Sequence, residues 1–481
     1  MSFLLLEAIN IEKYFADVQS LNIKNFKVYT GDRIGFVGAN GSGKTTLLNI
    51  LTGEIQPDAG VIHRNCDIAY IRQFGIITGN GSYNTRKLGE YDVLDKLENP
   101  VVSGGELTRI KIAQAFSEAH RLVFADEPTS NLDIHGVKQF EAELSRQDSF
   151  ILISHDRELL NRYCNRIMTI ENHGVVIYEG DYDAYKRQAT AKQERALFEY
   201  EQYANEKERL QKVYKDKKAK ASKVTKKPKG MSSSEAKQRA FIATSRSFDG
   251  RQKRADQAAK SVQARISQMD IKVKPREAPA MKLDFGLTDP PRGKIIFSGN
   301  ISFAYGDRYL FHNAEFEVEN GAKVAIQGAN GSGKTTLLNI LYSGEFTRAP
   351  KATIGYFRQG FEQLDMSKTL LQNAMADSVQ SETMVRSVLA RLLFTRNTIN
   401  KTAGVLSGGE RVKLSLAKLL VSRCNVLLLD EPTNYLDMPS LEVLQSILQE
   451  YEGTLMFVSH DRAFVNAVCT EILTVRDGKL K

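Results

Sequence analysis

One block of fourteen residues occurs twice in this chain without a single change. The block GANGSGKTTLLNIL occupies residues 38–51 and again residues 328–341. Further landmarks follow both copies in the same order: Gln73 and Gln359, VSGGE and LSGGE ending at Glu106 and Glu410, FADEPTSNLD and LLDEPTNYLD ending at Asp133 and Asp437, and SHDR beginning at Ser154 and Ser459. Self-similarity of this kind marks a duplicated structural unit, so the chain must contain two copies of one domain.

Each copy alternates apolar, strand-like runs with helical stretches. Residues 33–37 lead into the glycine-rich block, and residues 121–125 lead into Asp126. This alternation is typical of an α/β domain with a parallel sheet. A length of 481 residues suits two or three domains. We predict one α/β domain over residues 1–183 and a second over 293–481, joined by a linker over 184–292.

The repeated block matches the phosphate-binding pattern G-x-x-x-x-G-K-[ST]. Its glycines let backbone N–H groups close around phosphates at a helix N-terminus, its lysine adds charge, and its threonine hydroxyl can bind Mg²⁺. A glycine-rich turn without a ligand is the weaker alternative, because the block follows a strand and opens a helix. The predicted nucleotide-binding residues are Gly38, Asn40, Gly41, Ser42, Gly43, Lys44, Thr45 and Thr46, and then Gly328, Asn330, Gly331, Ser332, Gly333, Lys334, Thr335 and Thr336.

Two adjacent carboxylates end an apolar strand in each copy. Burying such a pair is costly without a cation or hydrogen-bond partners, which favours a site over ordinary surface charge. We expect the aspartate to bind Mg²⁺ and the glutamate to polarise the attacking water. The pairs are Asp126 with Glu127 and Asp430 with Glu431. His155 and His460 would donate near the γ-phosphate, and Gln73 and Gln359 would sense the metal or water.

The positive charge of the chain is concentrated in one segment. The net charge is +9, but residues 186–276 hold 26 Lys and Arg against 10 Asp and Glu, which leaves the remainder negative. A solvated helix usually balances its charges, so this excess indicates a polyanionic partner. A linker that is merely soluble is the alternative.

The basic segment shows the pattern of a helical hairpin. Ala189, Ala196, Tyr203 and Leu210 recur at sevenfold spacing in a first helix over about 184–220, and a second helix spans about 250–270. The two can pair antiparallel, with an apex over about 222–248 that contains proline and glycine. Lysines with a few exposed aromatics suit phosphates and bases of a folded RNA. The predicted RNA contacts are Lys217, Lys218, Lys220, Lys223, Lys226, Lys227, Phe241 and Phe248.

Other features limit the class of protein. No apolar run approaches the ~20 residues of a membrane helix, and the stretch Phe3–Leu6 lacks the charge and cleavage site of a signal peptide. We therefore expect a cytoplasmic chain without a membrane or DNA partner. The four cysteines form no C-x-x-C pair, which argues against a zinc or iron–sulfur site.

The order of motifs resembles the ATP-binding-cassette superfamily. A phosphate loop, a glutamine, SGGE, a strand ending in Asp-Glu, and Ser-His-Asp occur in that order, twice. The resemblance implies that two cassettes face head to tail within one monomeric chain and that both sites hydrolyse ATP. Lys44 would share one ATP with Ser407, Gly408 and Gly409, and Lys334 the other with Ser103, Gly104 and Gly105. Phe15 and Tyr305 would stack on adenine, with aromatic core packing as the alternative.

The basic hairpin narrows the resemblance to the ABC-F family. The resemblance implies that tandem cassettes bind the ribosomal exit site while the linker reaches toward the peptidyl-transferase centre, with large-subunit rRNA and P-site tRNA as partners. No arm interrupts the first cassette, and we expect no basic extension after Lys481; this organisation is similar to that of the antibiotic-resistance members of the Vga, Lsa and Msr kind. We expect ribosome protection, with a translation factor, or a transporter ATPase subunit, as alternatives.

Overall fold

A computed structural model describes residues 2–15, 18–73, 85–96, 103–117, 120–130, 132–224, 245–274, 291–306, 308–344, 347–358 and 363–481. The chain divides into two compact units. Met1–Tyr185 and Ala278–Lys481 form the first, which contains both copies of the repeat, and Lys186–Glu277 form the second. The second unit covers a narrower range than the linker that we proposed from the sequence, 184–292.

Each copy contains a six-stranded sheet whose first five strands are parallel. In the first copy the order is β5 (Ile68–Ile71), β6 (Leu122–Asp126), β7 (Phe150–Ile153), β3 (Arg33–Phe36), β8 (Arg166–Glu171) and β9 (Gly174–Glu179). In the second copy it is β14 (Ile354–Phe357), β15 (Val426–Asp430), β16 (Thr454–Val458), β12 (Lys323–Gln327), β17 (Glu471–Arg476) and β18 (Lys479–Leu480). Strands β6, β7, β15 and β16 are buried throughout, as expected for a parallel sheet covered on both faces. The predicted α/β fold is confirmed.

A three-stranded antiparallel sheet accompanies each of these sheets. The first contains β2 (Val18–Tyr29), β1 (Leu4–Phe15) and β4 (Ala59–Arg64), and the second contains β11 (Arg308–Glu319), β10 (Ile295–Tyr305) and β13 (Thr347–Arg348). The apolar stretch at the N-terminus is thus the start of β1. Strand β1 ends at Phe15 and strand β10 ends at Tyr305, so the two residues predicted to stack on adenine lie at strand ends.

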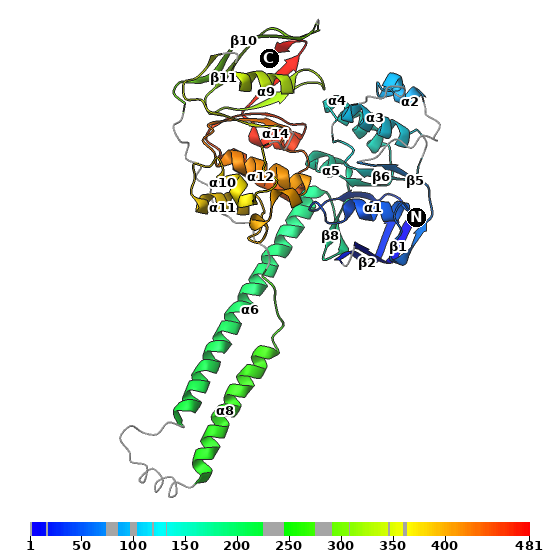
Figure 1. Cartoon of the computed structure of the whole chain (residues 1–481). Helices are drawn as coiled ribbons and strands as arrows, with labels where there is room; N and C mark the ends of the chain where they lie inside the picture. Colours follow the sequence, from blue (N-terminus) through cyan, green and yellow to red (C-terminus); the bar gives the residue numbers. More distant parts are fainter. Residues whose placement is uncertain are drawn as a thin grey trace. The chain divides into compact units, whose positions relative to one another are not determined.

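The helices of the first unit follow the motifs. In the first copy they are α1 (Lys44–Thr52), α2 (Thr85–Glu90), the 3-10 helix η1 (Leu94–Lys96), α3 (Gly104–Ala115), α4 (Ile134–Ser145) and α5 (Arg157–Tyr163). In the second they are α9 (Lys334–Ser343), α10 (Leu370–Met375), α11 (Glu382–Arg391), the 3-10 helices η2 (Thr398–Asn400) and η3 (Ala403–Val405), α12 (Gly408–Leu420), α13 (Met438–Glu450) and α14 (Arg462–Val468). Each SGGE motif supplies the cap of the helix that begins within it, Ser103 for α3 and Ser407 for α12. Both helices are labelled in Figure 1.

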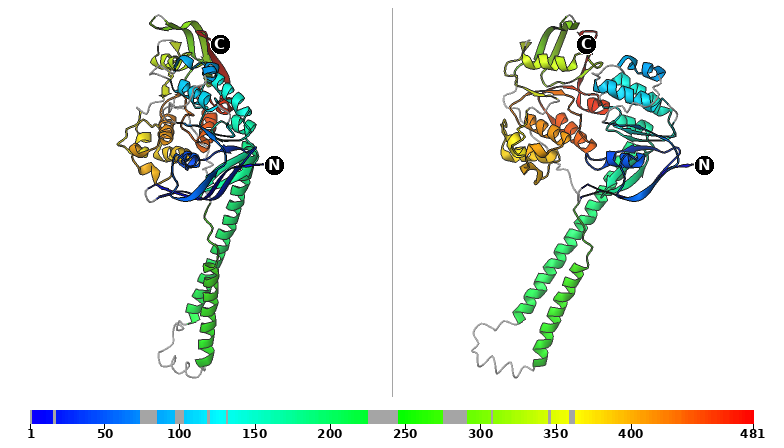
Figure 2. Two further views of the ribbon diagram at one scale, coloured as in Figure 1. Left: turned by 90° about the vertical axis from the view of Figure 1, so that its right-hand side faces the viewer. Right: turned by 45° about the vertical axis from the view of Figure 1, so that its right-hand side comes forward.

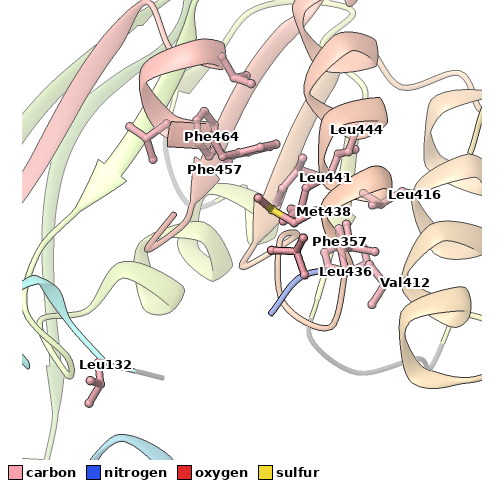
Figure 3. Close-up of a cluster of buried hydrophobic side chains, with 14 of the residues drawn as sticks. Leu132, Phe357, Val412, Leu416, Leu436, Met438, Leu441, Leu444, Phe457 and Phe464 are labelled. Atoms are coloured by element: carbon pink, nitrogen blue, oxygen red, sulfur yellow. The ribbon is translucent and has the colours of Figure 1, made fainter. Parts of the chain in front are cut away.

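The core of the second copy holds the strand that ends in Asp430. Figure 3 shows apolar side chains from α12, α13, α14 and the sheet packed together, and the buried residues labelled there include Phe357, Val412, Leu416, Leu436, Met438, Leu441, Leu444, Phe457 and Phe464. Leu436 and Met438 flank Asp437, so close packing fixes the turn that carries this aspartate.

Two long helices make up most of the described part of the second unit, and the first of them begins a few residues earlier, within the first unit. Helix α6 spans Tyr182–Val224 and α8 spans Ser245–Ser267. Figures 1 and 2 show them side by side in every view. Arg265 lies 3.6 Å from Glu206, and Lys217 Nζ donates to the Ala258 carbonyl at 3.4 Å, so the pairing is antiparallel as predicted.

The predicted heptad seam is formed over only part of its length. Leu210, Ala259 and Val262 are buried between the helices, but Ala196 is exposed. The prediction of a seam position at Ala196 was wrong because α8 ends at Ser267 and residues 271–274 are neither helix nor strand, with Lys272 paired to Glu199 at 3.2 Å. The predicted apex, residues 222–248, lies largely outside the residues that the structure describes.

None of the described helices is long and apolar enough to cross a membrane.

Candidate functional site

The phosphate loops leave helix N-termini open for an anion. Gly43 and Gly333 are the N-caps of α1 and α9, and neither cap offers a side-chain hydrogen bond to the first helical amides. Their φ angles of 99° and 107° lie in the left-handed region, which favours glycine. At Gly333 an added Cβ would also fall 2.8 Å from a Leu310 methyl carbon. Uncapped amides at a helix N-terminus are a ready site for phosphate oxygens.

A buried lysine lies inside each phosphate loop. Lys44 Nζ donates to the carbonyls of Gly38 and Ala39 at 2.8 and 2.9 Å. Lys334 Nζ makes the same two bonds, to Gly328 and Ala329, at 3.0 Å each. Burial lowers the pKa of both lysines. The charge is therefore held within the loop before any phosphate arrives.

A threonine and an aspartate meet where Mg²⁺ was predicted. Thr45 Oγ1 donates to Asp126 Oδ2 at 2.6 Å, and Thr335 likewise bonds Asp430. Burial raises the pKa of both aspartates. In the described part of the chain no three His, Cys, Asp or Glu side chains form an all-protein metal cage. A hard cation here would take part of its oxygen ligands from phosphates, as Mg²⁺ commonly does.

Several polar atoms at these loops are buried without a partner. Ser42 Oγ, Ser332 Oγ and Asp430 Oδ1 have no hydrogen bond in the described structure. Buried polar atoms are normally satisfied, so such a cluster of exceptions requires an explanation. A bound nucleotide and its metal ion would supply the missing partners, and the residues present fit both groups.

Each glutamate lies against the histidine of its own copy. His155 Nε2 is 3.1 Å from Glu127 Oε1, and His460 Nε2 is 3.2 Å from Glu431 Oε1. Both glutamates have a left-handed backbone, with φ of 49° and 51°, a strained conformation for a residue with a side chain. Their amides still donate to β7 and β16, at Ile153 and Val458, which anchors the strained residues to the sheet.

Burial sets the protonation of these groups. It raises the pKa of Glu127 to about 8 and that of Glu431 to about 7, and the adjacent aspartates add to the rise. Burial and the nearby lysine lower the pKa of each histidine to about 4. A neutral histidine beside a glutamate whose pKa lies near neutrality is a suitable arrangement for taking a proton from water.

The SGGE motifs are capping boxes. Ser103 Oγ accepts from the Glu106 amide, and Glu106 accepts from the Ser103 amide at 2.9 Å, which opens α3. Ser407 and Glu410 repeat these bonds at the start of α12. The sequence pattern S-x-x-E could have revealed this, because it satisfies two free helix amides at once.

The first phosphate loop contacts the second copy directly. The Asn40 amide donates to Asp437 Oδ2 at 2.9 Å, and Asn40 Nδ2 donates to the Tyr435 carbonyl at 2.8 Å. Gly409 is next to both groups, since an added Cβ would lie 2.4 Å from the Tyr435 oxygen and 3.2 Å from Asn40 Nδ2. The structure thus brings the loop of Lys44 together with the SGGE motif of the other copy. Asp437 and Tyr435 were not among the predicted site residues.

The second phosphate loop lines a cavity shared by both copies. Its volume is about 960 Å³, within the range of small-molecule sites. Among its lining residues are Ser103, Gly104, Gly105, Glu127, His155, Tyr305, Asn330, Gly331, Gly333, Lys334, Thr335, Thr336, Asp430, Glu431 and His460. Most of the residues predicted for the second site therefore surround one space.

The aromatic residues predicted to stack on adenine are exposed, and one of the two predicted glutamines is half-buried. Phe15 and Tyr305 are 51% and 62% exposed, so the alternative that they belong to the core is wrong. Gln73 is half-buried, and its main-chain oxygen accepts from Lys111 at 3.3 Å. Gln359 lies outside the described residues.

Gly408 and Gly409 offer a matched test of the contact between the copies. Nothing lies within 4 Å of a Cβ added at Gly408, whereas at Gly409 the Tyr435 carbonyl must move. Because small displacements at a reacting site are costly, Gly409→Ala should lower kcat/KM for ATP about tenfold more than Gly408→Ala. Steady-state phosphate release by the two variants measures this. Equal effects would show that the Tyr435 contact has no bearing on turnover.

Known proteins share these features. The family model described as ABC transporter matches residues 21–130 and 311–434. The chain is 31% identical to "Ribosome protection protein VmlR" of Bacillus subtilis (strain 168), covering 95% of this chain and 84% of that protein. It is 32% identical to "Erythromycin resistance ATP-binding protein MsrA" of Staphylococcus epidermidis, covering 95% of each. "ABC transporter F family member 5" of Arabidopsis thaliana is 28% identical over 98% of this chain and 75% of that protein.

The fold also matches solved structures. A structure of "RNase-L Inhibitor" superposes with a TM-score of 0.62 at 18% identity, covering 98% of this chain and 89% of that one. At this identity the match concerns the fold.

Proposed function

The chain belongs to the ABC-F family of ATP-binding-cassette ATPases, most like its ribosome-protection members, and on that basis we propose that it binds the ribosome and protects it from antibiotics. The drugs concerned act at the peptidyl-transferase centre or the exit tunnel. The proposed route is insertion of the linker apex near the peptidyl-transferase centre, with large-subunit rRNA near the exit site and P-site tRNA as partners. The chain hydrolyses ATP, and we assign this activity to two composite sites.

In each composite site the chain's own residues perform distinct steps. The phosphate loop and its lysine hold the phosphates, and the SGGE motif of the other copy closes over them. Thr45 with Asp126, and Thr335 with Asp430, would hold Mg²⁺, which supplies charge for the developing oxyanion. Glu127 and Glu431 orient the attacking water and take its proton, and the neutral histidines beside them would donate near the γ-phosphate.

The observation that carries the ribosome proposal is the basic helical unit that links the cassettes in sequence. Residues 186–276 have 26 Lys and Arg against 10 Asp and Glu. Lys212, Lys215 and Lys218 are exposed on α6, whereas Lys217 is half-buried and bonded to the Ala258 carbonyl. Solvated lysines on a rigid rod suit contacts with RNA phosphates. Lys226, Lys227 and Phe241 lie outside the described residues, and the side chains of Lys220, Lys223 and Phe248 are not described; all remain proposed contacts.

Co-sedimentation with ribosomes tests the proposal. The variant with Glu127→Gln and Glu431→Gln should pellet with purified ribosomes in the presence of ATP and without any membrane protein. An ATPase subunit of a transporter would not do so. Failure to pellet at low salt would overturn the ribosome proposal.

Replacing lysines of the linker should change how strongly ribosome binding depends on salt concentration. Lys218→Gln, Lys226→Gln and Lys227→Gln together should weaken ribosome binding and reduce the slope of log K against log salt by about one unit for each phosphate that is no longer neutralised. The matched control changes the same net charge on the cassettes, through Lys24→Gln, Lys138→Gln and Lys479→Gln, which are exposed. Sedimentation across a salt series measures both slopes. Identical slopes for the two triple variants would return the linker to a purely connecting role.

A translation factor without a resistance role is the alternative within the family. It would share every ATP-site residue and the ribosome binding described above. Growth of a susceptible bacterium that expresses the chain, measured against a panel of ribosome-targeting antibiotics, separates the two. Protection against none of the drugs would favour the translation factor.

A further inference from the structure

Arg109 connects the SGGE motif of the first copy to an acidic turn. It lies in the first turns of α3, and its Nη2 donates to Asp133 Oδ1 at 2.9 Å, with both side chains largely buried. The same Oδ1 accepts from the Gly136 amide at 2.9 Å and so caps α4. The Asp133 carboxylate therefore joins α3 to α4, at the end of the turn that begins at Glu127.

Asp133 also reaches the phosphate loop of the second copy. Burial opposes ionisation of its carboxyl, but the Gly136 amide, the Arg109 guanidinium and the Asn330 amide hold the pKa of Asp133 below its usual value. Arg109, Asp133 and Asn330 line the cavity that holds Lys334. Arg109 can thus act on this site through Asp133.

The second copy has the same arrangement with a different cation. Lys413 follows Glu410 at the position where Arg109 follows Glu106. Asp437 Oδ1 accepts from the Ser440 amide at 3.1 Å, while its Oδ2 accepts from Asn40 of the first phosphate loop.

Lys413 does not make the direct bond that Arg109 makes. Among the described residues it forms no ion pair with Asp437, and its Nζ lies 5.1 Å from the centroid of the Phe394 ring. It affects Asp437 only through charge at longer range. Arg109 thus fixes the direction of its carboxylate partner through one hydrogen bond from Nη2, and Lys413 has no such bond to Asp437.

We propose that Arg109 and Lys413 are positioning residues for ATP hydrolysis, which keep the SGGE motif of their own copy in register with the phosphate loop of the other copy, Arg109 through its direct bond to Asp133 and Lys413 through its charge near Asp437. Because only Arg109 makes a direct bond, its removal should have the larger effect of the two. This inference rests on the composite-site assignment made above, and it adds residues that differ between the two sites.

Two single substitutions each leave only one of the two ATP sites able to hydrolyse ATP. Glu127→Gln leaves turnover at the Lys334 site, and Glu431→Gln leaves turnover at the Lys44 site. Loss of a charged hydrogen bond should make Arg109→Ala lower kcat/KM for ATP about tenfold in the first background and less than about twofold in the second. Lys413→Ala should show the opposite preference, with a smaller loss. Phosphate release at a series of ATP concentrations measures each value.

The conservative variant separates positioning from simple stability. Arg109→Lys keeps the charge but loses the directed hydrogen bond from Nη2, so it should recover most of kcat while the KM for ATP at the Lys334 site stays raised. This KM change decides the question if Arg109→Ala lowers the thermal unfolding midpoint. Equal losses in both backgrounds, or no loss in either, would overturn the inference. Unchanged activity after Glu127→Gln or Glu431→Gln would instead overturn the site assignment, so the two failures are distinct.

Discussion

Replacing Glu127 and Glu431 together with glutamine should lower steady-state ATP hydrolysis by at least about a hundredfold, the contribution of a general base, while ATP still binds. Glutamine keeps the shape of the side chain but cannot take a proton from water. Glutamine cannot carry a negative charge beside Asp126 or Asp430 at any pH, so the affinity for ATP should stay the same or rise. Phosphate release measures the first effect, and equilibrium binding of labelled ATP measures the second.

The two single variants form the control for this result. Each should lose part of the activity, because each copy has its own glutamate, histidine and phosphate loop in matching geometry. The doubly substituted chain should remain closed on ATP if, as we propose, hydrolysis is the step that opens the cassettes. Full activity in either single variant would contradict the assignment of two working sites.

Deleting the linker apex, residues 222–248, in favour of a short glycine-serine turn should remove drug protection completely. The apex is the part of the proposed hairpin farthest along the paired helices, while the cassettes keep every residue of the ATP sites. Growth of a susceptible bacterium should fall to the level of cells without the protein. The panel should include lincosamides, streptogramin A compounds and pleuromutilins, with macrolides as the alternative class, a choice that follows from the family resemblance.

The truncated chain carries its own controls. Its ATPase rate should equal that of the intact chain, and most ribosome binding should persist through the cassettes. Retention of protection by the truncated chain would show that the apex is not the acting part. Loss of ATPase activity would instead indicate damage to the cassettes.

The sequence was sufficient for the features that depend on local spacing. A glycine-rich block that follows a strand and opens a helix left little freedom, so Lys44 and Lys334 lie where we predicted. The apolar runs before Asp126 and Asp430 were sufficient to place each aspartate at the end of a buried strand, and the site role of each carboxylate pair stays a prediction. The resemblance also implied that Gly409 would lie near the first phosphate loop, and the structure brings it next to Asn40.

Contacts between distant residues were not predictable from one sequence. Asn40 and Asp437 are 397 positions apart, and no local propensity connects them. Asp133 and Asp437 served as landmarks of the repeat, but their role as helix caps that also bind the opposite loop became visible only in three dimensions. The heptad pattern predicted the hairpin but missed where α8 ends, since spacing in one helix does not give the length of its partner.

The capping boxes imply a competition for a single proton. The Ser103 hydroxyl has one proton, and it already donates this proton to Glu106 Oε2 at 2.8 Å; Ser407 does the same with Glu410 at 2.9 Å. A phosphate oxygen that takes a hydrogen bond from either serine must therefore displace the glutamate. Both amide bonds of the capping box can persist, because the serine oxygen accepts from the glutamate amide and the glutamate accepts from the serine amide, so the arrival of a nucleotide would release one hydrogen bond of Glu106 or Glu410 without uncapping α3 or α12.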